Sequence, residues 1–244
     1  MGYTLTLVIK LVIAIVLAVI IGNGSVVVFN HFPSKWFEDT DDNGERNLPD
    51  KLLKSIEEGR QRLPSTPWKF AFTAFFGIAG VFMALREPLQ YLVGAMIVMA
   101  VVLEMAISDA LYQRVPDQLH MLLALSAVGF VGLYDLWWEP FAGAGIGLLL
   151  GLAVYGLGRL IYKKETIGGA DLKFYISMGL VAGRTGICVI FAVTTLLSAF
   201  YAAYRALMLK DIAKDSAVPM LPFAFVAVSV YMIFLFSVVD VLIL

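Results

Sequence analysis

Long apolar runs separated by short polar turns make up most of the chain. They cover approximately residues 5–21, 69–85, 89–108, 118–133, 141–161, 172–182, 187–206 and 220–242. Most of them approach the ~20 apolar residues that a helix needs to cross the hydrocarbon core of a bilayer. The pattern predicts an all-α polytopic membrane protein with about eight transmembrane helices.

One long polar segment, residues 30–68, separates the first run from the other seven. Within it, residues 49–62 have helical spacing, with Leu52, Leu53 and Ile56 on one face and charged residues on the others. This spacing is typical of an amphipathic helix. The acidic cluster before it lacks the spacing of a calcium-binding loop, so we expect a solvated turn there.

The polar segment also suggests how the chain is divided. We expect residues 1–67 to form a first transmembrane helix and a cytoplasmic loop without zinc-binding cysteines, and residues 68–244 to form a membrane-embedded core. Lys10 lies inside the first run rather than ahead of it, and no A-x-A-like cleavage site follows. The first run is therefore expected to remain as a helix rather than to act as a signal peptide.

The basic residues are distributed unequally between the two faces that eight crossings define. One face receives 15 of the 18 Lys and Arg residues, and the other receives Lys10, Arg86 and Arg184. The positive-inside rule makes the basic face cytoplasmic. Both termini are then expected on the outer side.

Composition excludes several classes of function. The mean hydropathy of +0.86 and the 60% hydrophobic content exceed those of a soluble domain of this length. A net charge of −1 argues against nucleic-acid binding. Cys188 is the single cysteine and His31 and His120 are isolated, so we expect no zinc or other metal site. His120 is expected to be a capping or interfacial residue.

Two carboxyl groups stand where chemistry is expected. Asp109 closes the third run and Asp171 opens the sixth, so both lie at the cytoplasmic end of a helix in this topology. Two acids in a poorly solvated site share one proton and titrate as a pair. The ionised member can deprotonate a water while the protonated member polarises a peptide carbonyl, without a metal.

The residues around Asp171 are small or charged. Gly168, Gly169 and Ala170 precede it and permit a tight turn and a close approach of another chain, and Lys173 follows two positions later. An ionisable residue beside hydrocarbon is costly and usually marks function.

The strings ISDALYQRVPDQL and GGADLKFYISMGLVAG resemble the two signature segments of the type IV prepilin peptidases. These enzymes are part of the GxGD intramembrane aspartyl proteases, which include the archaeal preflagellin peptidases. VPMLPFA near the end resembles the family's Pro-rich opening of the last helix, and GNGSVVVFNHFP resembles the segment that closes its first helix.

The chain departs from the family pattern at two places. Ala170 replaces the second glycine of GxGD, which reduces the backbone freedom of the turn. The two CxxC pairs that bind zinc in many bacterial members are absent. We expect peptidase activity without a cofactor and make no prediction of methyl transfer, so S-adenosylmethionine is a cofactor only if methylation is retained.

The resemblance implies a site at the cytoplasmic face of a bacterial-type inner membrane. Its substrates would be prepilins or pseudopilins, each with a short basic leader to be removed and an apolar helix held among the membrane lipids. Asp109 and Asp171 would be catalytic. The supporting residues would be Gly168, Gly169, Ala170, Lys173, Pro116, Asp117 and Glu104.

Three of these supporting residues carry specific expectations. Lys173 is expected to balance the charge of Asp171 or to contact lipid phosphate. Asp117, directly after Pro116, is expected to cap a helix rather than to act in catalysis. Glu104 either tunes the aspartate pair or pairs with Lys173.

Three other interpretations remain open at this point. Paired acids in membrane helices are also typical of a proton-coupled transporter. A non-catalytic component of a secretion system could keep the fold, although it would not need both aspartates. A presenilin-like protease is disfavoured because Pro222-Phe223-Ala224 stands in place of a Pro-Ala-Leu string.

Overall fold

The structure, a computed structural model, describes residues 2–40, 46–162, 169–208 and 218–237. Its elements, in chain order, are α1 (Gly2–His31), the 3₁₀ helix η1 (Ser34–Phe37), β1 (Asp39–Thr40), β2 (Arg46–Asn47), α2 (Asp50–Glu57), α3 (Trp68–Arg86), α4 (Leu89–Tyr112), α5 (Asp117–Ser126), the 3₁₀ helix η2 (Ala127–Leu133), α6 (Glu139–Tyr162), α7 (Gly169–Met208), α8 (Leu221–Val230) and the π-helical turn η3 (Tyr231–Leu235). β1 and β2 form a two-residue antiparallel pair.

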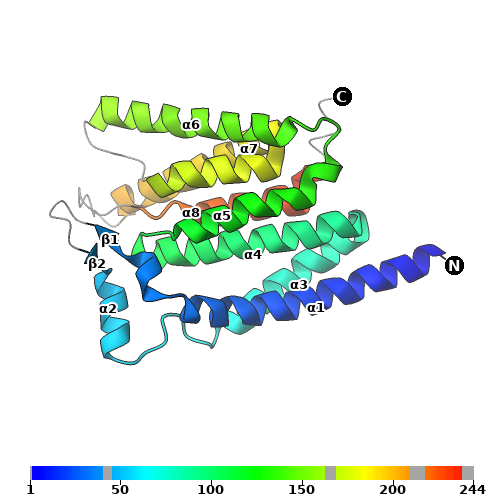
Figure 1. The fold of residues 1–244 in the computed structure, drawn as a ribbon, viewed down its shortest axis with the longest axis horizontal. Helices are drawn as coiled ribbons and strands as arrows, with labels where there is room; N and C mark the ends of the chain where they lie inside the picture. Colours follow the sequence, from blue (N-terminus) through cyan, green and yellow to red (C-terminus); the bar gives the residue numbers. More distant parts are fainter. Residues whose placement is uncertain (1, 41–45, 163–168, 209–217, 238–244) are drawn as a thin grey trace.

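The expected helical class is confirmed. Five helices among the described residues are long and apolar enough to cross a membrane: Thr4–His31, Trp68–Arg86, Leu89–Tyr112, Glu139–Gly156 and Gly169–Arg205. Two shorter apolar helical segments, Asp117–Leu133 and Leu221–Leu235, lie beside them (Figure 1). The chain is therefore a helical bundle whose dimensions and polarity suit a bilayer.

α1 is longer than its apolar run predicts. The sequence places the end of the first run near Ile21, but the helix continues through Gly22 to His31. A Cβ atom at Gly22 would overlap Thr73 of α3, so the glycine lets the two helices approach closely instead of ending the first one. α2 is shorter than expected, because Gly59 has φ 61° just beyond its last turn.

α7 consists of two helical segments that fold back on each other. Gly183 has φ 67° and ψ −172°, a combination that is essentially restricted to glycine, and it separates residues 169–182 from 184–208. The ring centroids of Tyr175 and Phe191 lie 5.2 Å apart. In a straight helix these residues would be about 24 Å apart. The two segments correspond to two separate apolar runs in the sequence.

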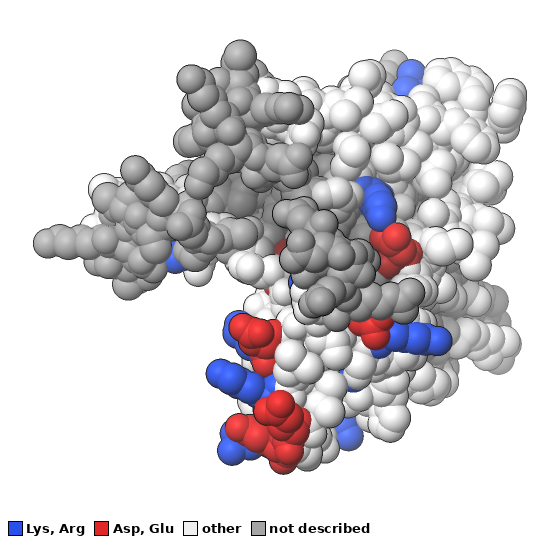
Figure 2. All heavy atoms as spheres, turned by 60° about the vertical axis from the view of Figure 1, so that its left-hand side comes forward, with Lys and Arg blue, Asp and Glu red and all other residues white. Residues whose placement is uncertain are grey.

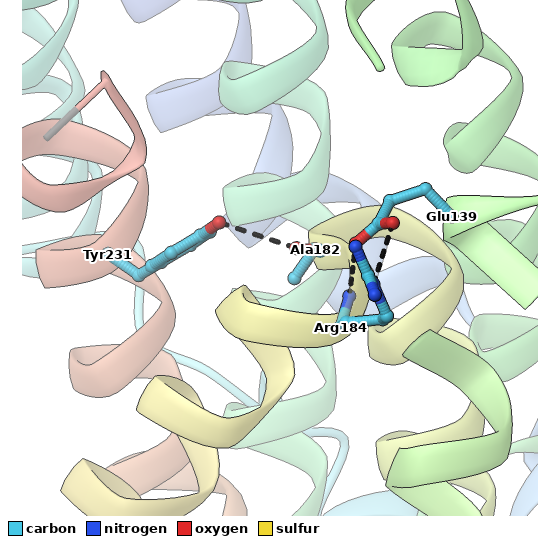
Figure 3. A network of polar contacts seen from close by, with 4 residues as sticks. All are labelled: Glu139, Ala182, Arg184 and Tyr231. Atoms are coloured by element: carbon cyan, nitrogen blue, oxygen red, sulfur yellow. Dashed lines mark hydrogen bonds and ion pairs between the residues drawn. The ribbon is translucent and has the colours of Figure 1, made fainter. Parts of the chain in front are cut away.

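Side chains from neighbouring helices satisfy the backbone at this turn (Figure 3). The hydroxyl of Tyr231 donates to the carbonyl of Ala182, at 3.3 Å, and the N–H of Arg184 donates to Oε1 of Glu139, at 3.1 Å. The guanidinium of Arg184 also pairs with Oε2 of Glu139, at 2.8 Å. Free backbone groups at a helix end need such partners, most of all in an apolar bundle.

α6 lies against the first segment of α7 (Figure 1). A Cβ atom at Gly143 would overlap the backbone of Gly179, and one at Gly147 would overlap the carbonyl of Tyr175. The absence of side chains at these positions brings the two backbones into close contact, as small residues do between membrane helices. α6 therefore constrains the helix that carries Asp171.

α4 is the most buried of the five long helices, with 78% of its apolar window inside the structure. It contacts α1 and α3 on one side and α5 and α8 on the other (Figure 1). α4 ends at Tyr112, where Gln113 adopts a left-handed conformation (φ 52°) and donates its N–H to the carbonyl of Asp109, at 2.9 Å. The chain then reverses into α5.

Candidate active site

Asp109 lies in the last turn of α4 and has an exposed fraction of 9%. Its Oδ2 accepts the backbone N–H of Leu221, the first residue of α8, at 2.9 Å. The start of a helix presents free N–H groups and a partial positive charge, and both stabilise a carboxylate. The Pro-rich segment before α8 therefore brings a helix start against Asp109, a contact that the sequence alone did not indicate.

Asp171 lies in the first turn of α7 and is half-buried. An acid in this position interacts favourably with the helix dipole. One turn later comes the buried Tyr175, whose ring packs against Phe191 of the returning segment. The fold-back at Gly183 thus supplies the far wall of the space in front of Asp171.

The two aspartates line a common cavity of about 470 Å³. Tyr175, Thr195 and Met220 are among its other lining residues, so α4, both segments of α7 and the start of α8 contribute to it. Asp109 and Asp171 are 62 positions apart in the sequence, yet the fold brings them to one space. The cavity is largely apolar apart from these acids, Gln113 and a few hydroxyl groups, and a poorly solvated setting favours a proton shared between paired carboxyls.

Lys173 pairs with Asp117 across the interface of α5 and α7. Its Nζ lies 2.7 Å from Oδ1 of Asp117, and both side chains are more than half exposed. Asp117 is the first residue of α5, directly after Pro116, and the helix has no side-chain capping hydrogen bond at this end. The ion pair thus links the two signature segments that the sequence singled out.

His120 is a site residue that the sequence analysis did not identify. It is buried, with an exposed fraction of 4%, and its Nε2 lies 2.9 Å from the carbonyl oxygen of Ala170, the residue before Asp171. The sequence feature that could have identified His120 is its spacing of three residues from Asp117, which places both side chains on one face of α5. The isolated histidine is buried near the start of α5 and contacts the aspartate turn.

Glu104 lies on a different side of α4 from the aspartate cavity. It is buried, with an exposed fraction of 6%, and hydrogen-bonds with Ser25 of α1. With Ser25 and Trp36 it lines a separate cavity of about 350 Å³ between α1, α4 and α5. Five residues correspond to about 140° of rotation along a helix, so Glu104 and Asp109 face different neighbours.

The structure describes two of the three small residues before Asp171. Gly168 lies outside the described residues. Gly169 is the first residue of α7 and a Cβ there would meet nothing within 4 Å, and Ala170 lines the aspartate cavity. Alanine in place of the second glycine is compatible with the helical start seen at this position.

The described residues contain no group of three or more His, Cys, Asp and Glu side chains that could hold a metal ion. His31 is exposed, and its Nδ1 lies 2.7 Å from the carbonyl of Val27 in its own helix. Cys188 is free and exposed. The two carboxyl groups that line the aspartate cavity are suited to acid–base chemistry.

Charged side chains of both signs gather at the end of the bundle where α4 finishes and α7 begins (Figure 2). They include the exposed charged residues of α2. The adjoining flank of the molecule is almost free of charge in this view, as expected for a surface that faces lipid.

Known proteins resemble this chain in the region of the two acids. Residues 96–203 match the model of the type IV leader peptidase family. The prepilin leader peptidase/N-methyltransferase of Klebsiella pneumoniae is 32% identical over 119 residues, which are 47% of this chain and 50% of that protein. The chain thus spans about half the length of this relative. No solved structure matches. The resemblance to the prepilin peptidases that the two segments indicated is confirmed.

Proposed function

We propose that this chain is an intramembrane aspartyl endopeptidase that removes the short basic leader of type IV prepilins or pseudopilins, with Asp109 and Asp171 as its catalytic pair. The observation that carries the proposal is the common cavity of these two acids. Both acids lie within residues 96–203, the stretch that matches the leader peptidase family.

In the proposed reaction the two acids have different roles. The ionised member of the pair deprotonates the attacking water. The protonated member keeps the shared proton and donates it toward the oxygen of the scissile carbonyl. When the peptide bond breaks, the proton taken from water passes to the leaving amine, and a carboxylic acid and an amine are released.

The proposed substrate enters as an apolar helix from the bilayer, with its basic leader on the charged end of the enzyme. Counting the two segments of α7 separately and including α5–η2 and α8–η3, the proposed topology has eight crossings. The face with 15 of the 18 basic residues is then cytoplasmic, and both termini are outside. The site would face the cytoplasm at a bacterial-type inner membrane.

The supporting residues have structural roles in this proposal. Gly169 precedes Asp171 and leaves room for a substrate backbone, and Pro116 precedes α5 beside the site. Asp117 and Lys173 tie α5 to α7. Residues 1–67 would form a first helix with its cytoplasmic loop. Residues 68–244 would form the peptidase core. No methyl transfer is included, since the relative that carries this name is matched over half its length.

A cleavage assay tests the proposal. Purified protein in detergent or nanodiscs is mixed with a prepilin that has a basic leader, and the product is identified by mass and N-terminal sequencing. We expect one shortened product from the wild-type chain and none from Asp109→Asn or Asp171→Asn. Cleavage by either variant at the wild-type rate would remove that aspartate from the mechanism. A failure of the wild-type chain to cleave, together with proton flux across proteoliposomes, would favour a transporter instead.

A further inference from the structure

α5 connects the two helices that carry the catalytic acids. It follows α4 after the four residues 113–116, so its start is tied covalently to the turn that contains Asp109. It also lies against α7 (Figure 1). The distance between the two carboxyl groups therefore depends in part on how firmly α5 holds the first turn of α7, in addition to the packing of α6 and α8 against α7.

Two polar contacts join α5 to that turn. Asp117 and His120 lie three residues apart on α5, and they contact Lys173 and Ala170, which lie three residues apart on α7. The Asp117–Lys173 pair is more than half exposed and is screened by solvent, so it contributes at most about 1 kcal/mol. The His120 contact is buried, and a hydrogen bond gains strength in an apolar surrounding.

The His120 contact is directed at the backbone of the catalytic turn. A carbonyl oxygen only accepts hydrogen bonds, so Nε2 must carry the proton and donate it to Ala170. The acceptor is the carbonyl of the peptide unit that joins Ala170 to Asp171. A donor from outside the helix therefore adds a restraint on this peptide unit and, with it, on the direction in which Asp171 leaves the backbone.

From this geometry we infer that His120 is a positioning residue: its hydrogen bond to Ala170 holds Asp171 at the distance from Asp109 that the shared-proton chemistry requires. This assignment rests on the proposed peptidase function. His120 itself does not line the aspartate cavity, so it acts through Ala170 and not on the substrate.

Kinetics of three variants test this role. His120→Met removes the donor and keeps an apolar side chain of similar size, whereas His120→Gln keeps an N–H donor at a comparable reach. His31→Met is the matched control. His31 is exposed, and the hydrogen bond described for its ring is to a carbonyl of its own helix. Each variant is assayed for kcat, KM and Tm with the prepilin substrate.

We expect His120→Met to lower kcat about tenfold with KM within about twofold, since a misplacement of ~1 Å can cost about a hundredfold in rate. His120→Gln should recover most of the loss, and His31→Met should behave as wild type. A purely structural role predicts a lower Tm in His120→Met with an unchanged kcat per folded molecule, and this result would overturn the inference. A loss in His120→Gln as large as in His120→Met would do the same.

A distance measurement separates this inference from the proposed function. Spin labels on Ala110→Cys and Gly169→Cys, in a Cys188→Ser background, report the separation of the two catalytic turns; Ala110 and Gly169 are both exposed. We expect a narrow distance distribution that broadens or shifts when His120→Met is added. An unchanged distribution would refute the positioning role even if the chain cleaved no prepilin. If His120→Met changes the distance distribution in a chain that has no peptidase activity, the positioning role of His120 is supported although the proposed function is not.

Discussion

The two ends of the bundle each place carboxyl groups beside a break between helices, but they use them differently. At the Gly183 turn, Glu139 receives the N–H and the guanidinium of Arg184, and its side chain is only 14% exposed (Figure 3). At the other end, Asp109 receives a backbone N–H and shares a cavity with a second acid, Asp171.

The difference lies in the partner of each carboxyl group. A carboxylate matched by a guanidinium has its charge compensated, so it stabilises one arrangement of the chain and is unsuited to exchange protons. Two acids on one cavity repel each other when both are ionised, and this repulsion favours a state in which they share one proton. The first arrangement is suited to maintaining a turn and the second to acid–base chemistry.

Replacing a carboxyl group by the isosteric amide should affect the cleavage rate at one end of the bundle and the stability at the other. This is the largest effect that we expect. Asp109→Asn or Asp171→Asn should lower the cleavage rate at least about a hundredfold, the typical contribution of a general acid or base, with little change in Tm. Glu139→Gln should leave the rate per folded molecule near wild type. It should reduce stability by about 1 kcal/mol, because it keeps one acceptor oxygen and loses the charge.

Rates and Tm values of the three variants, measured on the same preparations, check this contrast. Loss of cleavage in well-folded Glu139→Gln would show that the far end takes part in the chemistry, and the comparison would then be wrong.

The next effect concerns the turn itself. Gly183→Ala places a Cβ on a backbone with φ 67° and ψ −172°, about 3.0 Å from the ring of Tyr134. We expect a loss of about 1–3 kcal/mol, the usual cost of such a backbone conformation in a residue other than glycine. Thermal unfolding in detergent measures it, with Gly145→Ala in α6 as control, since a Cβ there would meet nothing within 4 Å. An unchanged Tm would mean that the turn is not strained by a side chain.

A smaller effect separates the proposed catalytic role of Asp109 from its contact with α8. Asp109→Asn keeps an oxygen that can accept the N–H of Leu221, whereas Asp109→Ala leaves this buried N–H without its acceptor. Both variants should lack activity, but only Asp109→Ala should also lose about 1–3 kcal/mol of stability. Equal Tm values for the two variants would show that the contact with α8 contributes nothing to the fold.

The smallest effect is expected at the exposed ion pair. Lys173→Met should change stability by less than about 1 kcal/mol, because Lys173 and Asp117 are both more than half exposed. The change should shrink further in high salt, which screens exposed charges. A larger loss of stability that persists at high salt would mean that this pair stabilises the fold as Glu139–Arg184 does, and not as an ordinary surface pair.

Several features of the candidate site followed from the order of residues alone. Asp109 and Asp171 each stand at the end of an apolar run, and the alternation of runs across the membrane was enough to predict that they lie at the same end. The all-helical class followed in the same way, because hydropathy and helical periodicity are local properties of the chain.

The contacts between helices could be learned only from the tertiary structure. The start of α8 against Asp109, the bond from His120 to Ala170 and the pairing of Lys173 with Asp117 each join residues that are far apart in sequence. Glu104 faces α1 and a separate cavity, although it lies only five positions before Asp109. The reason is rotational. An apolar run predicts that a helix forms, but the angle at which that helix packs decides which of its side chains meets which neighbour.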